Sequence, residues 1–320
     1  MTRKEFLVKA LNSINAKGII QNTYEIIVIK NFLDETIDMS ISKVAKMNIY
    51  SERSGLGQKI VEVIKVVNDN EMIVFLEDDD LFFDEKINRL LEVMDKTEDI
   101  YFYHNAFISV NERGNYLGVY KNHLKSSIVV NLASNFKQIL YAALNGGAHN
   151  LSSMAVSSNL IKSYSELIES ITYTLDHAFF LLSLDSGHSM YFDNTLLTKY
   201  TVHNGASRLN FLENDYLENK REFIRNAKSE LVRVRSFLKN KSALNASDFF
   251  IWELGLHEWF LSSDGKNTIS NRNLFAITMV AISHGRYLLF LLTCIVAIGK
   301  ILRLNKIVRG KIYRLGASLV

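Results

Sequence analysis

Apolar and polar positions follow two different periods in residues 1–208, and this predicts an α/β fold. Short apolar runs of strand length alternate with segments whose apolar residues are spaced three or four apart. The expected strands are 24–30, 47–50, 72–76, 100–111, 151–156, 190–193 and 195–202. The expected helices are 3–15, a segment opening after Gly55, and 87–94, 136–144, 157–168 and 173–182. Alternating elements of this kind favour a sheet flanked by helices, with polar strand ends on one edge.

The most distinctive polar feature is a run of four acids that follows the apolar run 72–76. It consists of Glu77, Asp78, Asp79 and Asp80. Acid runs are commonly solvated turns, but the apolar residues on both sides place this one beside a packed wall. Two carboxylates about 4 Å apart repel by roughly 4 kcal/mol at an effective dielectric constant near 20. Either a shared proton or a hard cation, Mg²⁺ or Mn²⁺, relieves that repulsion.

Three further polar features lie at the ends of predicted strands. Asn31 follows the strand 24–30, and a loop with Gly55 and Gly57 opens a helix, where free N–H groups can bind an anion. An ordinary entry from loop to helix explains the same two glycines. His203 follows the strand 195–202, and a single histidine in such a place is more often structural than a ligand.

Asp176 is the one acid at the start of an otherwise apolar helix, 173–182. A carboxylate in the first turn is favoured by the helix dipole, which would make Asp176 a structural residue. The alternative is a general base at the mouth of a pocket. The sequence pattern leaves both interpretations open.

Charge and cysteine content narrow the class of protein. The chain has 37 basic and 34 acidic residues and a net charge of +3. Its single cysteine excludes an internal disulfide, and the absence of disulfides favours an intracellular protein. From residue 300 onward there are six basic residues and no acid, so the first 299 carry 31 minus 34, or −3. A nucleic-acid-binding domain is therefore not expected. The N-terminus does not resemble a signal peptide.

The C-terminal third predicts helices and a membrane surface. Residues 209–240 have the spacing of a solvated helix, and 274–299 form an apolar stretch broken at Arg286. An arginine at a bilayer centre costs about 2.5 to 3.5 kcal/mol, and each half is too short to span, so an interfacial hairpin is expected. The basic amphipathic segment after residue 300 is typical of a helix on anionic lipid, at the cytoplasmic face.

Taken together, these motifs resemble the family 2 glycosyltransferases of the GT-A fold, over residues 2 to 208. The segments that carry the resemblance are Tyr24-Glu-Ile-Ile-Val-Ile, Gly55-Leu-Gly-Gln-Lys, Phe75-Leu-Glu-Asp-Asp-Asp-Leu-Phe, Leu175-Asp-His-Ala-Phe-Phe and Leu197-Thr-Lys-Tyr-Thr-Val-His-Asn-Gly-Ala-Ser207. The resemblance implies a mixed, mostly parallel sheet flanked by helices. It also implies an inverting, metal-dependent transfer of a sugar from a nucleotide-diphosphate sugar.

The resemblance also implies roles for individual residues. Asp176 falls on the catalytic base. The metal-site positions are Glu77, Asp79 and His203, with Mg²⁺ or Mn²⁺ as the ion. The donor-binding positions are Asn31, Gly55, Gly57, Lys59, Glu77 and Asp78. The acceptor is expected to be a glycan or a lipid-linked molecule at the membrane.

Departures from the family pattern keep other functions open. The strand that usually precedes the first helix is not recognisable here, Lys30-Asn31 replaces an expected aspartate pair, and Ile60-Val61 replaces Arg-Asn. A truncated, catalytically impaired relative that acts as a membrane-bound binding or scaffold subunit is the alternative. A metal-dependent phosphohydrolase is a third possibility. The expected organisation is a transferase domain (1–208), a helical extension (209–270) and membrane-associating helices (271–320), peripheral or monotopic.

Overall fold

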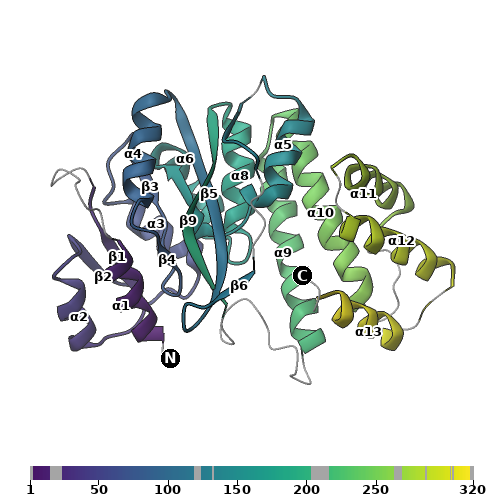
Figure 1. Ribbon diagram of the computed structural model, residues 1–320, viewed down its shortest axis with the longest axis horizontal. Coiled ribbons are helices and arrows are strands. Elements are labelled where there is room, and N and C mark those ends of the chain that lie inside the picture. Colours follow the sequence, from purple (N-terminus) through teal and green to yellow (C-terminus); the bar gives the residue numbers. More distant parts are fainter. Residues whose placement is uncertain are drawn as a thin grey trace. The chain divides into compact units, whose positions relative to one another are not determined.

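The computed structural model describes residues 3–14, 24–118, 124–131, 133–202, 216–262, 269–284, 287–302, 304 and 306–317. The chain divides into two compact units, Met1–His203 and Asn204–Val320. The first unit holds the sheets and the second is helical in its described residues (Figure 1). Segments 209–270 and 271–320, which the sequence suggested as separate parts, lie in one unit.

A two-stranded parallel sheet opens the first unit. Strands β1 (Ile27–Lys30) and β2 (Met47–Tyr50) pair in register, and helices α1 (Arg3–Ser13) and α2 (Glu35–Ile41) accompany them (Figure 1). Leu11, Val28 and Ile41 form the small core between these elements. In the described part of the first 26 residues the chain forms a helix and no strand.

The larger sheet has seven strands and runs in the order β3-β8-β5-β9-β4, with β6 beside β5 and β7 beside β9. The bounds are β3 (Met72–Val74), β4 (Leu81–Phe82), β5 (Ile100–Asn111), β6 (Tyr116–Gly118), β7 (Ile128–Val130), β8 (Met154–Ser157) and β9 (Ser189–Val202). Strands β3 and β5 are both antiparallel to β8, and β9 is parallel to β5, so β3, β5 and β9 share one direction. The mixed sheet flanked by helices is confirmed. Its parallel share is smaller than expected, because only β1–β2 and β5–β9 pair in parallel among the described strands.

Strand β9 corrects one prediction, since residues 190–193 and 195–202 form a single strand rather than two. The pairing register with β5 jumps from Asn105 opposite Asp193 to Ala106 opposite Leu196. Two residues of β9 are therefore accommodated as a β-bulge. The carboxylate of Asp193 stabilises the bulge, since its Oδ1 accepts a hydrogen bond from the Thr195 N–H at 2.9 Å. A polar insertion thus bends the strand without ending it.

Helices cover both faces of this sheet. Helix α4 (Lys86–Lys96) packs through Leu90 and Val93 on the face that carries Tyr103. Helix α8 (Leu175–Ser186) packs on the opposite face, where the ring of Phe102 meets Phe180 edge to face with centroids 6.2 Å apart (Figure 1). The remaining helices of this unit are α3 (Leu56–Ile64), α5 (Phe136–Ala142), η1 (Ala143–Gly147), η2 (Leu151–Ser153), α6 (Ser158–Ser163) and α7 (Ser165–Glu169). The single helix predicted for 157–168 is thus two short ones, separated at Tyr164.

Gly57 allows α3 to approach α7 closely. A Cβ atom at position 57 would lie 2.0 Å from the carbonyl oxygen of Ile168 and 2.5 Å from that of Ile171. These are backbone atoms, which cannot rotate away as a side chain would. The packing of the two elements therefore accounts for a glycine at this position.

The variant Gly57→Ala is expected to lower the free energy of unfolding by about 3 kcal/mol, because the added methyl group overpacks the helix contact. Urea unfolding monitored by circular dichroism measures the loss. Gly55→Ala is the matched control, since a Cβ there approaches only the flexible Gln58 side chain, at 3.1 Å. Equal stability of the two variants would contradict the packing role.

The second unit consists of helices in its described residues. They are α9 (Tyr216–Phe237), α10 (Lys241–Leu261), α11 (Asn271–Ser283), α12 (Tyr287–Ile301) and α13 (Lys306–Ala317). The predicted break in the apolar stretch 274–299 is confirmed, because α11 ends at Ser283 and α12 begins at Tyr287. Among the helices of the described residues, none has both the length and the apolar content needed to cross a bilayer.

Candidate functional site

The acid run forms a turn at the end of β3 and is attached to the start of β8. The Phe75 N–H donates to the Met154 carbonyl at 3.2 Å, which extends the β3–β8 ladder by one bond. The Glu77 N–H then donates to the Ser152 hydroxyl at 3.0 Å. Asp80 N–H closes the turn by donating to the Glu77 carbonyl at 3.3 Å. As the strand pattern predicted, carboxylates are delivered at the C-terminal end of a strand, where open α/β sheets bind their ligands.

Asp80 is the most deeply buried of the four acids, a feature that the sequence did not distinguish. Its side chain is fully buried, and its Oδ1 accepts a hydrogen bond from the Thr201 N–H at 2.8 Å. Oδ2 has no hydrogen-bond partner among the described residues. Burial, with added repulsion from Asp79, raises the pKa of Asp80 to about 8. At neutral pH the protein without a bound cation therefore holds a proton on this carboxyl.

Glu77 experiences the combined charge of the whole cluster. Its carboxyl is half-buried, and loss of water raises its pKa well above the usual value. The negative charges of Asp80, Asp79, Asp176 and Asp78 raise that pKa further, in that order of effect. The influence of Asp176 shows that this residue, about a hundred positions later in the chain, lies within electrostatic range of the acid turn.

A buried lysine supports the turn from behind. The Lys86 ammonium contacts the Asn105 side-chain oxygen and lies 3.4 Å from the Ser152 carbonyl. Burial lowers its pKa to about 7. The buried Lys86 thus stabilises, from inside the core, the segment of Ser152, whose hydroxyl group accepts the hydrogen bond from the Glu77 N–H.

Asp176 lies in the first turn of α8, next to two histidines. Burial alone would raise the pKa of Asp176, but the charges and hydrogen bonds of His177, with a smaller effect from His149, leave it below the usual value. The carboxylate of Asp176 is therefore ionised at neutral pH, whereas Asp80 holds a proton and the pKa of Glu77 is shifted upward. Acids whose environments shift their pKa in opposite directions are suited to different roles.

Other predicted site residues lie at several places in the first unit. Asp78 and Asp79 are half-buried in the acid turn, and Asn31 is exposed after β1. Lys59 is half-buried in the first turn of α3. The Gly55 N–H donates to the Gln58 side chain at 3.3 Å, so this glycine N–H has an internal partner. His203 lies outside the described residues. The four acids and Asp176 are brought together, since the charge of Asp176 acts on Glu77.

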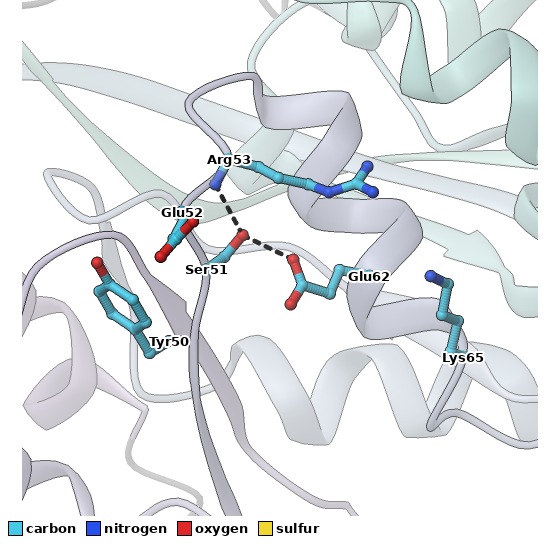
Figure 2. A pocket seen from close by; sticks show the side chains of 6 residues that line it. All are labelled: Tyr50, Ser51, Glu52, Arg53, Glu62 and Lys65. Atoms are coloured by element: carbon cyan, nitrogen blue, oxygen red, sulfur yellow. Dashed lines mark hydrogen bonds between the residues drawn. The ribbon is translucent and has the colours of Figure 1, made fainter.

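A surface hollow of about 500 Å³ lies at the end of β2 (Figure 2). Its lining is polar and consists of Tyr50, Ser51, Glu52, Arg53, Glu62 and Lys65. The Ser51 hydroxyl donates to Glu62 at 2.6 Å and accepts from the Arg53 N–H at 3.2 Å (Figure 2). None of these residues belongs to the acid turn. The candidate site is therefore the β3 end, where the charged groups converge, and not this hollow.

The acid turn suits a divalent cation. Oxygen ligands from carboxylates are the donor set that Mg²⁺ and Mn²⁺ prefer. The buried Oδ2 of Asp80 has no hydrogen-bond partner among the described residues, and the neighbouring acids help to raise the pKa of Glu77, so a cation at this turn would relieve repulsion between the carboxylates. Glu77 and Asp79 are the residues that would hold the ion at the solvent side of the turn.

Asp80→Asn is expected to change how stability depends on pH. Because the folded-state pKa of Asp80 (about 8) exceeds the value of 3.8 for a solvent-exposed aspartate, the wild type takes up a proton on folding between these pH values. Its stability therefore falls as pH rises through that window, at a limit of about 1.4 kcal/mol per pH unit. Asparagine cannot ionise, so the variant avoids this loss.

The measurement is urea unfolding at pH 5 and pH 8 in a chelating buffer. Between pH 5 and pH 8 the free energy of unfolding of the wild type should fall, relative to that of the variant, by on the order of 2 kcal/mol or more. Asp95→Asn, an exposed acid on α4, is the control and should follow the wild type. An identical pH profile for Asp80→Asn and wild type would show that Asp80 is ionised in the folded protein.

Comparison with known proteins shows a family similarity over the first part of the chain and the fold. Residues 2–150 match the family described as "Glycosyl transferase family 2". The structure is similar to residues 1–349 of S. aureus TarS, with a TM-score of 0.57 and 13% identity, covering 94% of this chain and 89% of that one. It is also similar to the mannosyltransferase PcManGT from Pyrobaculum calidifontis, solved with GDP-Man and Mn²⁺, with a TM-score of 0.54 and 10% identity, covering 99% and 83%. Both neighbours have the GT-A fold, as predicted. None of the curated proteins compared matches in sequence.

Proposed function

We propose that this chain, whose residues 2–150 match glycosyl transferase family 2, is an inverting, metal-dependent glycosyltransferase. It transfers a sugar from a nucleotide-diphosphate sugar to a hydroxyl group of a glycan or lipid-linked acceptor. Glycosyl transfer itself follows from the family, and PcManGT, which shares the fold, was solved with GDP-Man and Mn²⁺. Donor, metal, stereochemistry and acceptor at the membrane are the parts proposed here.

The proposal rests on one observation: the carboxylates of the acid turn and the ionised carboxylate of Asp176 lie near one another. Glu77 and Asp79 lie in the turn that follows β3, and Asp176 lies in the first turn of α8, close enough for its charge to raise the pKa of Glu77. The acid turn is suited to a cation and the diphosphate that it neutralises. Asp176 is ionised and beside histidines, which suits a base. In the proposed site, the acid turn would thus bind the donor diphosphate with its cation, and Asp176 would act on the acceptor hydroxyl.

In the proposed reaction Asp176 removes the proton from the acceptor hydroxyl while that oxygen attacks the anomeric carbon. The bond between that carbon and the donor phosphate breaks, and the nucleoside diphosphate leaves with the bonding electrons. Attack from the side opposite the leaving group inverts the configuration. A cation held by Glu77 and Asp79 would stabilise the charge that develops on the diphosphate. Ser152 and Lys86 keep the acid turn in place during this step.

The acceptor is proposed to be membrane-associated because the second unit presents apolar side chains to solvent. Phe275, Met279 and Ile282 lie on one side of α11 and are 67%, 50% and 57% exposed. Leu291 and Ile298, seven residues apart on α12, are 53% and 54% exposed. After residue 264 the sequence has nine basic residues and no acid. Apolar surface next to excess positive charge fits an anionic phospholipid surface at the cytoplasmic face.

Vesicle sedimentation tests this membrane contact. Phe275→Glu combined with Met279→Glu should reduce binding to vesicles rich in phosphatidylserine by at least about tenfold, because apolar burial is replaced by charge repulsion. Val232→Glu on α9 is the control, since Val232 is also apolar and 52% exposed but lies outside the two stripes. Equal binding of both proteins, or no binding by the wild type, would refute the membrane contact.

The test of transfer uses the full chain with Mn²⁺, a panel of nucleotide-diphosphate sugars and a lipid acceptor fraction. The expected result is a glycosylated product with inverted anomeric configuration and one nucleoside diphosphate released per sugar. Release of inorganic phosphate instead would identify a phosphohydrolase. No product and no donor turnover would refute the catalytic proposal.

A binding or scaffold subunit is the alternative, and one contact favours it. The Lys30 ammonium, where the family has an acid, is buried and pairs with Asp38 at 2.9 Å. The nucleoside side of the site therefore has a positive group that is already neutralised within the protein. Binding of a nucleotide-diphosphate sugar without any turnover would support this alternative.

A further inference from the structure

Two histidines and an aspartate form a compact cluster beside the acid turn. One possible ligand atom from each of His149, Asp176 and His177 lies within 4.8 Å of the other two. Nδ1 of His177 is 2.9 Å from Oδ1 of Asp176. The rings of His149 and His177 are nearly perpendicular, at 82°, with centroids 4.8 Å apart. Residues from two separate segments thus converge on one small volume.

The backbone holds both halves of the cluster in position. On α8, the His177 N–H donates to Oδ1 of Asp176 at 2.8 Å, which orients that carboxylate. On the other segment, the His149 N–H donates to the Gly146 carbonyl at 3.0 Å. The His149 carbonyl accepts a hydrogen bond from Nε2 of His104 at 2.8 Å. Since a carbonyl can only accept, Nε2 of His104 carries a proton, and this buried ring fixes the segment from the core.

The local backbone shape at His149 also depends on its neighbours. Gly147 packs against Phe192, where a Cβ atom would lie 2.5 Å from the ring. Asn150 has a φ of 67°, and its side chain accepts from the Ser152 N–H at 3.1 Å. The same short segment therefore delivers His149 to the cluster and Ser152 to the acid turn.

The chemistry of the cluster differs from that of the acid turn. Two imidazole nitrogens and one carboxylate oxygen suit Zn²⁺, Co²⁺, Fe²⁺ and similar ions, whereas oxygen ligands alone suit Mg²⁺ and Mn²⁺. We infer that His149, Asp176 and His177 form a second metal site, selective for a transition ion of the zinc type. His149 is exposed, so an ion can enter from solvent, and the coordination positions that remain can bind water.

The geometry requires only a small adjustment. Ligand atoms around a tetrahedral zinc ion, with bonds of about 2.0 to 2.1 Å, lie about 3.4 Å apart. The present separations of up to 4.8 Å must shorten by about 1 Å or more to reach that spacing. A rotation of the exposed His149 side chain provides this movement, while Asp176 and His177 stay on the helix.

Occupation of this site has a consequence for catalysis. The positive charge of an ion bound to one oxygen of Asp176 lowers the proton affinity of the whole carboxylate, which weakens it as a base. The ion is therefore an inhibitor of transfer, active at low concentration in the presence of excess Mg²⁺. This consequence rests on the proposed function, whereas the binding of the ion does not.

Cobalt titration tests the site directly, because Co²⁺ bound to histidine and carboxylate ligands absorbs visible light. The full chain, prepared without a polyhistidine tag, is titrated with Co²⁺ in excess Mg²⁺. The wild type should bind one ion, displaced by Zn²⁺. His149→Ala and His177→Ala should each bind it at least about 100-fold more weakly, since loss of a direct ligand costs more than the roughly 10- to 100-fold lost when a residue that only orients a ligand is replaced.

Two controls separate this site from its surroundings. Asp79→Asn, in the acid turn, and His188→Ala, an exposed histidine paired with Asp99 at 2.7 Å, should both keep wild-type Co²⁺ affinity. Thermal unfolding curves confirm that each variant is folded. Unchanged affinity in His149→Ala, or loss of binding in Asp79→Asn alone, would overturn the assignment. Absence of sugar transfer would refute the proposed function and leave the cobalt result unaffected.

Discussion

Asp176→Asn is expected to slow sugar transfer by about 10²- to 10⁴-fold, because asparagine cannot accept the proton of the acceptor hydroxyl. The amide has the same shape as the carboxylate and can still accept the hydrogen bond from the His177 N–H. Donor binding depends on other residues, so kcat should fall while the KM for the donor stays near the wild-type value. Steady-state release of nucleoside diphosphate measures both constants.

Asp185→Asn is the matched control for this variant. Asp185 lies on the same helix, near its C-terminal end, and is only half-buried. Its replacement should leave kcat within about twofold of wild type, which corresponds to less than about 0.5 kcal/mol. If both variants retain wild-type kcat, Asp176 is not the base. If both lose activity equally, the loss reflects damage to α8.

Asp79→Ala has the second large expected effect, on the dependence of transfer on metal. Removal of this carboxylate takes away one oxygen ligand of the proposed metal site, while the buried Asp80 still anchors the turn through the Thr201 N–H. The rate at saturating Mn²⁺ should fall at least about 100-fold, as expected for loss of several kcal/mol of charge stabilisation on the leaving group. Half-maximal activity should also require more Mn²⁺.

Asp84→Ala provides the comparison for Asp79→Ala. Asp84 follows the acid turn by a few residues and is exposed, so its loss removes one negative charge from the same region. A change in the net field alone would affect both variants alike. A Mn²⁺ dependence of Asp79→Ala that matches wild type would exclude Asp79 as a metal ligand.

The positions of the acid turn and of Asp176 could be predicted from the sequence. The apolar run before Glu77 has the length of a buried strand, and the structure places the carboxylates at the end of β3. Asp176 precedes a continuous apolar helix, and it lies in the first turn of α8. Both are local patterns, in which neighbours in the chain determine the conformation.

Features that depend on contacts between distant segments could not be predicted. His149 approaches His177 only because Gly147 packs on Phe192 and His104 binds the His149 carbonyl. The burial of Asp80 depends on the Thr201 N–H, more than a hundred residues away. No spacing in the chain indicates these pairs.

Gly57 shows how one residue type can serve either of two purposes. In the sequence, Gly55 and Gly57 were typical of a loop that binds phosphate at a helix N-terminus. In the structure Gly57 lies against the Ile168 carbonyl, where only the absence of a side chain permits the helix contact. The choice between a ligand and a packing contact required knowledge of what lies opposite the glycine.

Calorimetric titration of nucleoside diphosphates, including GDP, into the full chain tests the central claim, which is that the end of β3 is a metal-assisted donor site. With Mn²⁺ present, the wild type should bind one of them at least about tenfold more tightly than in a chelating buffer, a difference of about 1.4 kcal/mol. Asp79→Ala should lose this gain. Binding that is the same with and without Mn²⁺, or no binding to any nucleoside diphosphate, would contradict the claim.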